Sequence, residues 1–292
     1  MYLKKFTLPG DIAETNEIIY EKRTCFNTFY PFKIFTQKEL DEVEFGNITM
    51  FYGGNGSGKS TLINLIAAKL QADRYSDFNG APLFDRFVNM CRVEYYRRPE
   101  LKLVLTSDDV FDYVLNARLV NERIDEKRNA LFDKYVEVKT QAISQPGVGG
   151  LKGLDDYERW KEISDILSPR RSQSSFVRER VVSDVDLRSN GETALRYFLD
   201  KIDEDGIYLL DEPENSLSIE FQMELADYIV NTARATRSQF VIATHSPVLL
   251  AMKGAKIYNL DDYPADVCEW TELPNVRRYF DFFMDHKDEF EQ

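Results

Sequence analysis

One short segment constrains the fold of this chain more than any other. Residues Gly53-Gly54-Asn55-Gly56-Ser57-Gly58-Lys59-Ser60 match the pattern GxxxxGK(S/T). An apolar run at Asn47–Tyr52 precedes it, and Lys59–Leu70 follows with apolar residues spaced for one helix face. Because glycine lets the backbone wrap closely, several N–H groups of such a turn can point at one phosphate. A strand, a glycine-rich turn and a helix in this order predict a phosphate-binding loop in an α/β fold.

The residues of this loop have separate expected tasks. Lys59 should reach the β- and γ-phosphates of a nucleotide, and Ser60 should ligate Mg²⁺. Thr61 could contact the α-phosphate, and the helix that begins near Lys59 adds its N-terminal dipole. We therefore expect ATP and Mg²⁺ as cofactors. The nucleotide-binding residues expected here are Gly53, Gly54, Asn55, Gly56, Ser57, Gly58, Lys59, Ser60 and Thr61.

A second motif supplies two carboxylates. The apolar run Ile207–Leu210 predicts a buried strand, and Asp211 and Glu212 follow it directly. A buried strand delivers its last residues to the edge where α/β folds bind ligands. Asp211 would hold Mg²⁺, and Glu212 would orient and deprotonate the attacking water. Pro213 disfavours a helical conformation at Glu212. The alternative is an acidic pair at an ordinary strand end.

A third strand end carries a histidine. His245 follows the apolar run Val241–Thr244, and the sequence holds one other histidine, His286. From this position His245 could donate a hydrogen bond to the γ-phosphate or to the attacking water; the alternative is a structural role. The expected catalytic residues are thus Lys59, Glu212 and His245, and the expected metal ligands are Ser60 and Asp211.

The middle of the chain has a different composition. The net charge is −13, so the chain as a whole does not attract nucleic acid or other polyanions. Between Arg118 and Arg180 the balance turns slightly basic, and a glycine-rich break at Gln145–Gly153 separates two charged helical segments. We expect one domain over residues 1–292 with a helical arm inserted at about 108–180. The arm could contact a nucleic acid or a protein partner through Arg170, Arg171, Arg178 and Arg180, or it could be a pair of solvated helices.

Two further features bear on compartment. The three cysteines, Cys25, Cys91 and Cys268, are scattered, which argues against a disulfide framework or a zinc site and fits a reducing cytosol. No apolar run approaches the roughly 20 residues that span a bilayer. We therefore expect a cytoplasmic protein without membrane contact.

Alternating aromatic and polar residues around Cys25–Phe35 suggest strands there.

The three motifs, in this order, resemble those of ABC-type ATPases of the SMC and RecF group. Asp211–Ser218 (DEPENSLS) and Thr244–Pro247 match in order, and Ser189-Asn190-Gly191-Glu192 stands where that family has its signature peptide. The resemblance implies a mixed sheet flanked by helices, and two ATP molecules sandwiched in a head-to-tail homodimer. Ser189, Gly191 and Glu192 would then reach the nucleotide of the opposite subunit. Asn190 and Ser218 depart from the family pattern.

The resemblance extends to small stand-alone bacterial proteins called AAA family ATPases. Our first hypothesis is a soluble ABC-like ATPase that uses ATP-driven dimerisation as a switch, in DNA maintenance or anti-phage defence. Two alternatives are the ATPase subunit of an ABC transporter and a nucleotide-gated binding protein with little turnover. Glu192 and the missing Q-loop glutamine argue against the transporter, and Glu212 argues against the binding protein. Candidates for the Q-loop position are Ser107 and Asp108, and candidates for stacking on adenine are Phe32 and Phe35.

Overall fold

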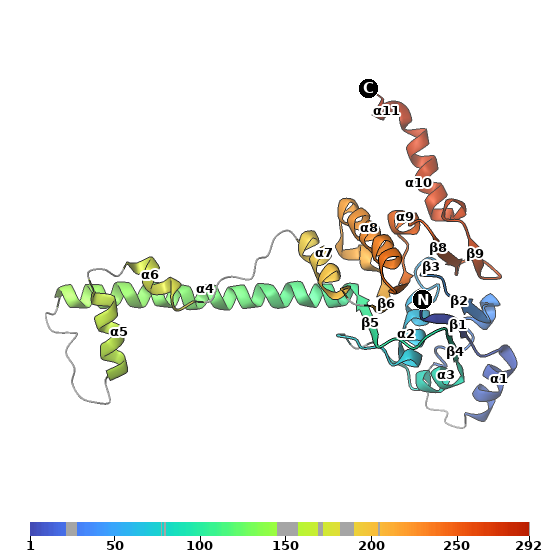
Figure 1. Cartoon of the computed structure of the whole chain (residues 1–292), viewed down its shortest axis with the longest axis horizontal. Coiled ribbons are helices and arrows are strands. Elements are labelled where there is room, and N and C mark those ends of the chain that lie inside the picture. Colours follow the sequence, from blue (N-terminus) through green and yellow to red (C-terminus); the bar gives the residue numbers. More distant parts are fainter. Residues whose placement is uncertain are drawn as a thin grey trace. The chain divides into compact units, whose positions relative to one another are not determined.

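The computed structural model in Figure 1 describes residues 1–21, 28–76, 78, 80–144, 157–168, 172–181, 190–203 and 205–291. It divides into two compact units. The first unit combines Met1–Asp112 with Ser189–Gln292, and the second comprises Tyr113–Arg188. The helical arm that we predicted from composition, at about 108–180, overlaps this second unit in sequence.

A six-stranded mixed sheet forms the centre of the first unit, in agreement with the predicted fold class (Figure 1). Its order is β5-β6-β7-β3-β8-β9. The strands from β5 to β8 pair in parallel, and β9 pairs antiparallel to β8. Parallel strands place their carboxyl ends at one edge of the sheet. The strands are β3 (Ile48–Tyr52), β5 (Leu101–Thr106), β6 (Gly206–Asp211), β7 (Gln239–Ala243), β8 (Ala255–Asn259) and β9 (Asp266–Cys268).

Helices cover both faces of this sheet. Side chains of β6 and β7 alternate between the faces, so Ile207 and Val241 join the core that includes helix α2, while Tyr208 and Phe240 stack on each other on the opposite side. Helix α8 packs on β7 and against α7 and α9. The helices of the first unit, beside the start of α4, are α1 (Asp11–Tyr20), α2 (Lys59–Leu70), α3 (Phe84–Met90), α7 (Asn190–Lys201), α8 (Ile219–Ala235), α9 (Pro247–Leu250), α10 (Pro274–Asp285) and α11 (Lys287–Phe290).

A small antiparallel sheet, ordered β2-β1-β4, joins the main sheet through one buried glutamine. Its strands are β1 (Leu3–Thr7), β2 (Glu42–Glu44) and β4 (Arg92–Tyr95). The Oε1 atom of Gln239, at the start of β7, accepts hydrogen bonds from the backbone N–H groups of Tyr2 and Leu3 at 2.9 and 2.7 Å. Its Nε2 atom donates to the carbonyls of Leu3 and Gly46 at 3.1 and 2.8 Å. One fully buried side chain therefore satisfies four backbone groups at the junction.

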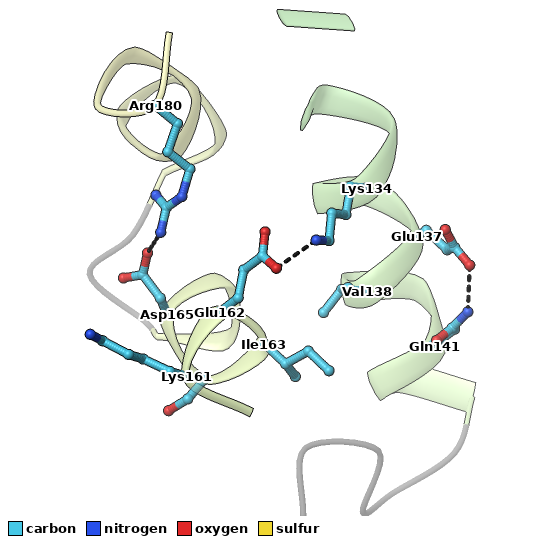
Figure 2. Close-up of a pocket in the computed structure, with 10 residues that line it drawn as sticks. Lys134, Glu137, Val138, Gln141, Lys161, Glu162, Ile163, Asp165 and Arg180 are labelled. Carbon is cyan, nitrogen blue, oxygen red and sulfur yellow. Dashed lines mark hydrogen bonds and ion pairs between the residues drawn. The ribbon is translucent and has the colours of Figure 1, made fainter. Parts of the chain in front are cut away.

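The second unit contains most of the long helix α4 (Ser107–Ser144), together with α5 (Tyr157–Leu167) and α6 (Gln173–Arg178). Its small core is formed by Val138, Ile166, Phe176 and Val177. Two ion pairs tie the helices together, Lys134–Glu162 at 2.5 Å and Arg180–Asp165 at 2.8 Å (Figure 2). None of the described helices combines the length and the apolar character needed to cross a membrane.

The structure corrects two expectations about the N-terminal region. Residues 29–35 form turns rather than the strands suggested by the alternating pattern, while 22–27 lie outside the described residues. Phe32 and Phe35 are 6% and 0% exposed in the core, so neither is available to stack on adenine. Apolar spacing alone does not distinguish a strand from a turn whose aromatic side chains are buried.

We expect Gln239→Leu to lower the free energy of unfolding by about 3 kcal/mol, because it leaves four buried backbone groups without partners. Urea denaturation followed by circular dichroism measures the change. Gln37→Leu, at an exposed position, is the matched control and should cost less than about 0.5 kcal/mol. Equal stability of the two variants would show that the glutamine does not join the sheets.

Candidate nucleotide site

The motifs from three separate parts of the sequence meet at the carboxyl edge of the main sheet. Strands β6, β7 and β3 are neighbours in the order β6-β7-β3. Each of them ends in one of the predicted motifs: β3 leads into Gly53–Ser60, β6 into Asp211 and Glu212, and β7 into Thr244 and His245. The parallel pairing therefore brings together residues that lie almost 200 positions apart in the chain.

The phosphate-binding loop has the backbone that its glycines predict. Gly56 and Gly58 have φ values of +80° and +99°, a region that residues with a side chain rarely adopt. A Cβ atom on Gly58 would also meet Ile34 at 3.1 Å and Phe35 at 3.4 Å. Helix α2 then begins at Lys59. The first N–H groups of this helix are directed toward the loop, as phosphate binding requires.

Lys59 is buried and surrounded by oxygen atoms. Its Nζ atom donates to the carbonyls of Gly53 and Gly54 at 2.8 and 3.2 Å, and it lies 3.3 Å from Oε1 of Glu212. Only 4% of Lys59 is exposed, so this charge must be compensated within the protein. The lysine thus lies next to the carboxylate that we predicted to be the catalytic base.

Ser60 and Asp211 face each other as the predicted metal ligands should. The Ser60 hydroxyl donates to Oδ1 of Asp211 at 3.0 Å. Burial raises the pKa of Asp211 from 3.8 to about 6; the hydrogen bond from Ser60 opposes this shift, and the nearby Glu212 adds to it. Among the described residues, no cluster of three or more His, Cys, Asp or Glu side chains could hold a metal alone. A partly buried carboxylate beside a hydroxyl fits Mg²⁺ that takes its other ligands from phosphates and water.

Glu212 has an unusual backbone for a non-glycine residue. Its φ and ψ are 48° and 52°, in the left-handed region. Pro213 disfavours the right-handed helical region at this position, as the sequence suggested. The N–H of Glu212 donates to the carbonyl of Ala243 at 2.9 Å, and the Asn215 amide donates to its Oε2 at 3.1 Å. The turn Pro213–Ser216 (η3) begins directly after it, so the side chain is held in place from both sides.

Glu214 organises the histidine strand end, and the sequence analysis did not single it out. Its Oε1 accepts from the Thr244 hydroxyl at 2.7 Å and from the N–H groups of His245 and Ser246 at 2.8 and 3.2 Å. Oε1 also lies 3.3 Å from Nδ1 of His245, which is 3.8 Å from Glu212. The histidine therefore turns Nδ1 toward two carboxylates, which leaves Nε2 to meet a phosphate. The one sequence signal was that Glu214 is the third acid of DEPENSLS, after Asp211 and Glu212.

A cavity of about 400 Å³ opens beside the two acids at the end of β6. Asp211 and Glu212 line it together with Ser60, and Ser107 and Asp108 line it from the end of β5. The Q-loop candidates thus share a cavity with the predicted metal ligands. The remaining lining residues are Asn64, Arg74, Ser76, Phe78, Thr106 and Asn215.

Two contacts and one buried hydroxyl at the loop were not anticipated. The Asp261 carboxylate, after β8, accepts from the N–H of Gly54 at 2.8 Å. The Thr61 hydroxyl accepts from Tyr30 at 2.9 Å, so it is already engaged on the protein side. The Ser57 hydroxyl is buried, and no group of the described residues bonds to it. A buried hydroxyl of this kind within a phosphate-binding loop is available to a ligand.

The predicted signature peptide belongs to a different helix. Ser189 lies outside the described residues, and α7 begins at Asn190, directly after it. Gly191 lies against α8, because a Cβ atom there would meet the Phe221 ring at 2.9 Å. Glu192 is the acidic residue of the first turn of α7, where a carboxylate also interacts favourably with the helix dipole.

We expect Asp211→Asn to stabilise the protein in the absence of metal and nucleotide. The folded protein takes up a proton at Asp211 near pH 6, but the unfolded chain does so only near pH 3.8. The Asp211 contribution therefore falls as pH rises from about 4 to 6 and remains unfavourable above that. Removing the charge should raise the free energy of unfolding at pH 7.5 by up to about 3 kcal/mol.

Thermal unfolding in the presence of a chelator, at several pH values, measures this gain. The advantage of Asp211→Asn over the wild type should shrink as the pH falls below 6 and be lost near pH 4. A variant that is less stable than the wild type at pH 7.5 would contradict the burial argument.

A family model matches part of this chain. Residues 152–251 match the model described as "AAA domain, putative AbiEii toxin, Type IV TA system". The matched stretch includes β6, the acidic strand end, α8, β7 and His245. No curated protein matches the chain.

Several solved structures are similar to the chain. One is an Smc head domain from Pyrococcus furiosus, with an extended coiled coil and bound to the C-terminal domain of ScpA (15% identity, TM-score 0.38, covering 84% of this chain and 95% of that chain). Another is a nucleotide-free ATP-binding cassette from an ABC transporter (12% identity, TM-score 0.40, covering 91% of this chain and 90% of that chain). A third is an SMC head domain from Thermotoga maritima (13% identity, TM-score 0.36, covering 92% of this chain and 99% of that chain). At these identities and scores the likenesses carry no argument about function.

The fold is identified by the chain's own features together with the family match. Strand β3, the phosphate-binding loop and α2 follow one another as in P-loop proteins, and two neighbouring strands add the acidic pair and the histidine. The resemblance inferred from the motifs is thereby confirmed: the chain has the fold and the motifs of ABC/SMC-like P-loop proteins.

Proposed function

We propose that this protein binds and hydrolyses ATP with Mg²⁺, and that ATP binding brings two copies of the chain together. The observation that carries the proposal is the convergence of Lys59, Ser60, Asp211 and Glu212, with Lys59 only 3.3 Å from Glu212. These residues come from two strand ends, and their proximity supports a site for phosphate transfer to water.

The first step is an exchange of partners at Lys59. Before nucleotide binds, two loop carbonyls and Glu212 satisfy the ammonium group. The β- and γ-phosphates would take over this charge, since charge-assisted bonds to phosphate are stronger than bonds to neutral carbonyls. Mg²⁺ bound by Ser60 and Asp211 would neutralise further negative charge on the phosphates. Glu212, released from the lysine, would then be available to a water molecule.

Glu212 is suited to the role of general base. Its backbone is fixed by Ala243 and Pro213, and its carboxylate is oriented by Asn215. It could accept a proton from water that attacks the γ-phosphorus atom, while the bond to the leaving ADP oxygen breaks. His245, with Nδ1 turned toward Glu214, could donate from Nε2 to the γ-phosphate. Preorganised donors around developing charge are usually the largest contribution to such catalysis.

Dimerisation would complete the site from the side that the loop leaves open. The loop and Asp211 would hold the phosphates from one side, and Ser189–Glu192 of a second copy would supply a hydroxyl, N–H groups and a helix start. The close contact between Gly191 and Phe221 gives that glycine a separate role in packing α7 on α8. A test of the composite site must therefore substitute a different residue of the peptide, because a side chain at Gly191 would disturb its own helix pair.

A role in anti-phage defence or DNA maintenance belongs to the same proposal. The description of the matched family names a toxin of a type IV toxin–antitoxin system, which favours defence. Of the arginines that could contact a nucleic acid, Arg170 and Arg171 lie outside the described residues. Arg180 is paired with Asp165 and lies 4.0 Å from the centre of the Phe176 ring, so it serves the internal packing of the second unit.

Lys59→Ala and Glu212→Gln should fail in different ways. Without the Lys59 charge, nucleotide affinity should fall, whereas Glu212→Gln keeps the shape of the side chain and should bind ATP without turnover. We expect Glu212→Gln to lower kcat by at least about 10²-fold, the usual scale for loss of a general base. Nucleotide titration and phosphate release measure the two effects. Hydrolysis by Glu212→Gln at the wild-type rate would overturn the assignment of the base.

ATP should drive dimerisation of the Glu212→Gln protein, and Ser189→Asp in that background should prevent it. A carboxylate at Ser189 would face the γ-phosphate of the opposite copy and repel it. Light scattering with and without Mg-ATP measures the linkage. Ser174→Asp, at an exposed position of α6, is the matched control and should dimerise normally. If Ser189→Asp leaves the ATP-driven shift intact, the serine only caps α7.

A further inference from the structure

Helix α10 carries an apolar surface that the described part of the chain leaves uncovered. The helix is anchored at its start, where Leu273 and Val276 are buried and the N–H of Asn275 donates to the Tyr52 hydroxyl at 3.2 Å. Beyond that point its large apolar side chains are 49–55% exposed. They are Tyr279, Phe280, Phe282, Phe283 and Met284, which we call the α10 stripe.

Five such residues within the six positions 279–284, interrupted only by Asp281, are different from scattered exposed side chains. Single exposed apolar residues are normal on a protein surface, but a contiguous patch marks an interaction site. In a helix, the positions of Tyr279, Phe280 and Phe283 fall on the same face as the buried Val276. The face that anchors the helix at its start is therefore the face that remains open along the rest of it.

The charges beside the stripe indicate what covers it. Arg277 and Asp281 lie one turn apart along one margin, and the Arg277 guanidinium is 5.8 Å from the centre of the Phe280 ring. A second α10 running antiparallel would place its Asp281 beside Arg277 and its Arg277 beside Asp281. In a parallel pair, the two copies of this margin would lie on opposite sides of the interface, so Arg277 and Asp281 would not meet. The margin is thus complementary to itself in the antiparallel direction only.

We propose that the α10 stripe pairs antiparallel with the α10 stripe of a second copy of this chain, about a two-fold axis near Tyr279. Each of the five side chains buries about 150–250 Å² when fully covered, and about half of that is still exposed. Pairing would bury roughly 1,000 Å² in total, near the lower limit for a specific interface. The pair therefore associates weakly, and it does so without nucleotide.

The position of α10 makes this pairing compatible with the proposed ATP-bound dimer. Tyr52, which accepts the hydrogen bond from the start of α10, is the last residue of β3 and directly precedes the phosphate-binding loop. The helix thus starts at the nucleotide edge of the sheet. Both associations are symmetric, so one two-fold axis can serve both. The pairing itself does not rest on the proposed ATPase function.

The first experiment measures mass by light scattering without nucleotide, over a range of protein concentrations. The wild type should shift toward dimer as concentration rises. Phe283→Glu should weaken the association at least tenfold, because it places a charge in the centre of the stripe. Ile12→Glu, at an exposed position of α1, is the matched control and should associate as the wild type does. Circular dichroism should show equal helix content in all three proteins.

The second experiment tests the antiparallel charge pairing. Arg277→Glu alone would face Asp281 of its copy, and Asp281→Arg alone would face Arg277, so each variant should self-associate less than the wild type. A one-to-one mixture of the two should recover dimers, because both contacts then join opposite charges. Charge interactions within one helix are the same before and after mixing, so recovery reports contacts between copies.

Three outcomes would overturn the proposal: a wild type that stays monomeric at every concentration, equal association of Phe283→Glu and the wild type, or a mixture no more dimeric than its components. Loss of dimers in Val230→Glu, with no recovery in the mixture, would instead assign the stripe to the groove between α8 and α9, which Val230 lines. These measurements use no nucleotide, so their failure leaves the proposed ATPase function standing. Conversely, Ser189→Asp should not affect the nucleotide-free pair.

Discussion

The burial of one positive charge determines much of the arrangement at the nucleotide edge. Lys59 is almost inaccessible to solvent, and an ammonium group can remain there only with several oxygen partners. Two of these are carbonyls of its own loop, which fixes the loop's curvature, and the third is a carboxylate from β6. The contact thereby joins the loop after β3 to the end of β6. Strand β7, between them, receives the N–H of Glu212 at its last carbonyl.

The fold and most of the loop could be predicted from the sequence because their signals are local. A glycine pattern that requires positive φ values, followed by a lysine, leaves few alternatives, and Gly56 and Gly58 have such φ values. Apolar runs that end in Asp211 and His245 predicted strand ends, and parallel pairing then required those ends to meet. The pairing order itself was implied by the resemblance to a family and not by any property of the individual strands.

Features that depend on contacts across the fold could not be predicted in this way. Glu214 looks like a surface acid in the sequence, and only the turn after Glu212 directs its carboxylate at the backbone N–H groups that follow β7. Gln239 looks like a polar residue at a strand start, although it joins two sheets. Phe32 and Phe35 precede the loop in sequence as an adenine-stacking residue would. Both side chains are instead buried among the other apolar residues of the core.

The close approach of Gly191 to Phe221 has a mechanical consequence. With no side chain between them, the first turn of α7 cannot move toward α8 without displacing that helix. Helix α8 follows the short turn Pro213–Ser216, and this turn follows Glu212. A displacement of the start of α7 would therefore be transmitted through the Phe221 ring and the start of α8 to Glu212, the carboxylate proposed to activate water. In the proposed mechanism, such a displacement would change the timing of hydrolysis without any contact with the nucleotide.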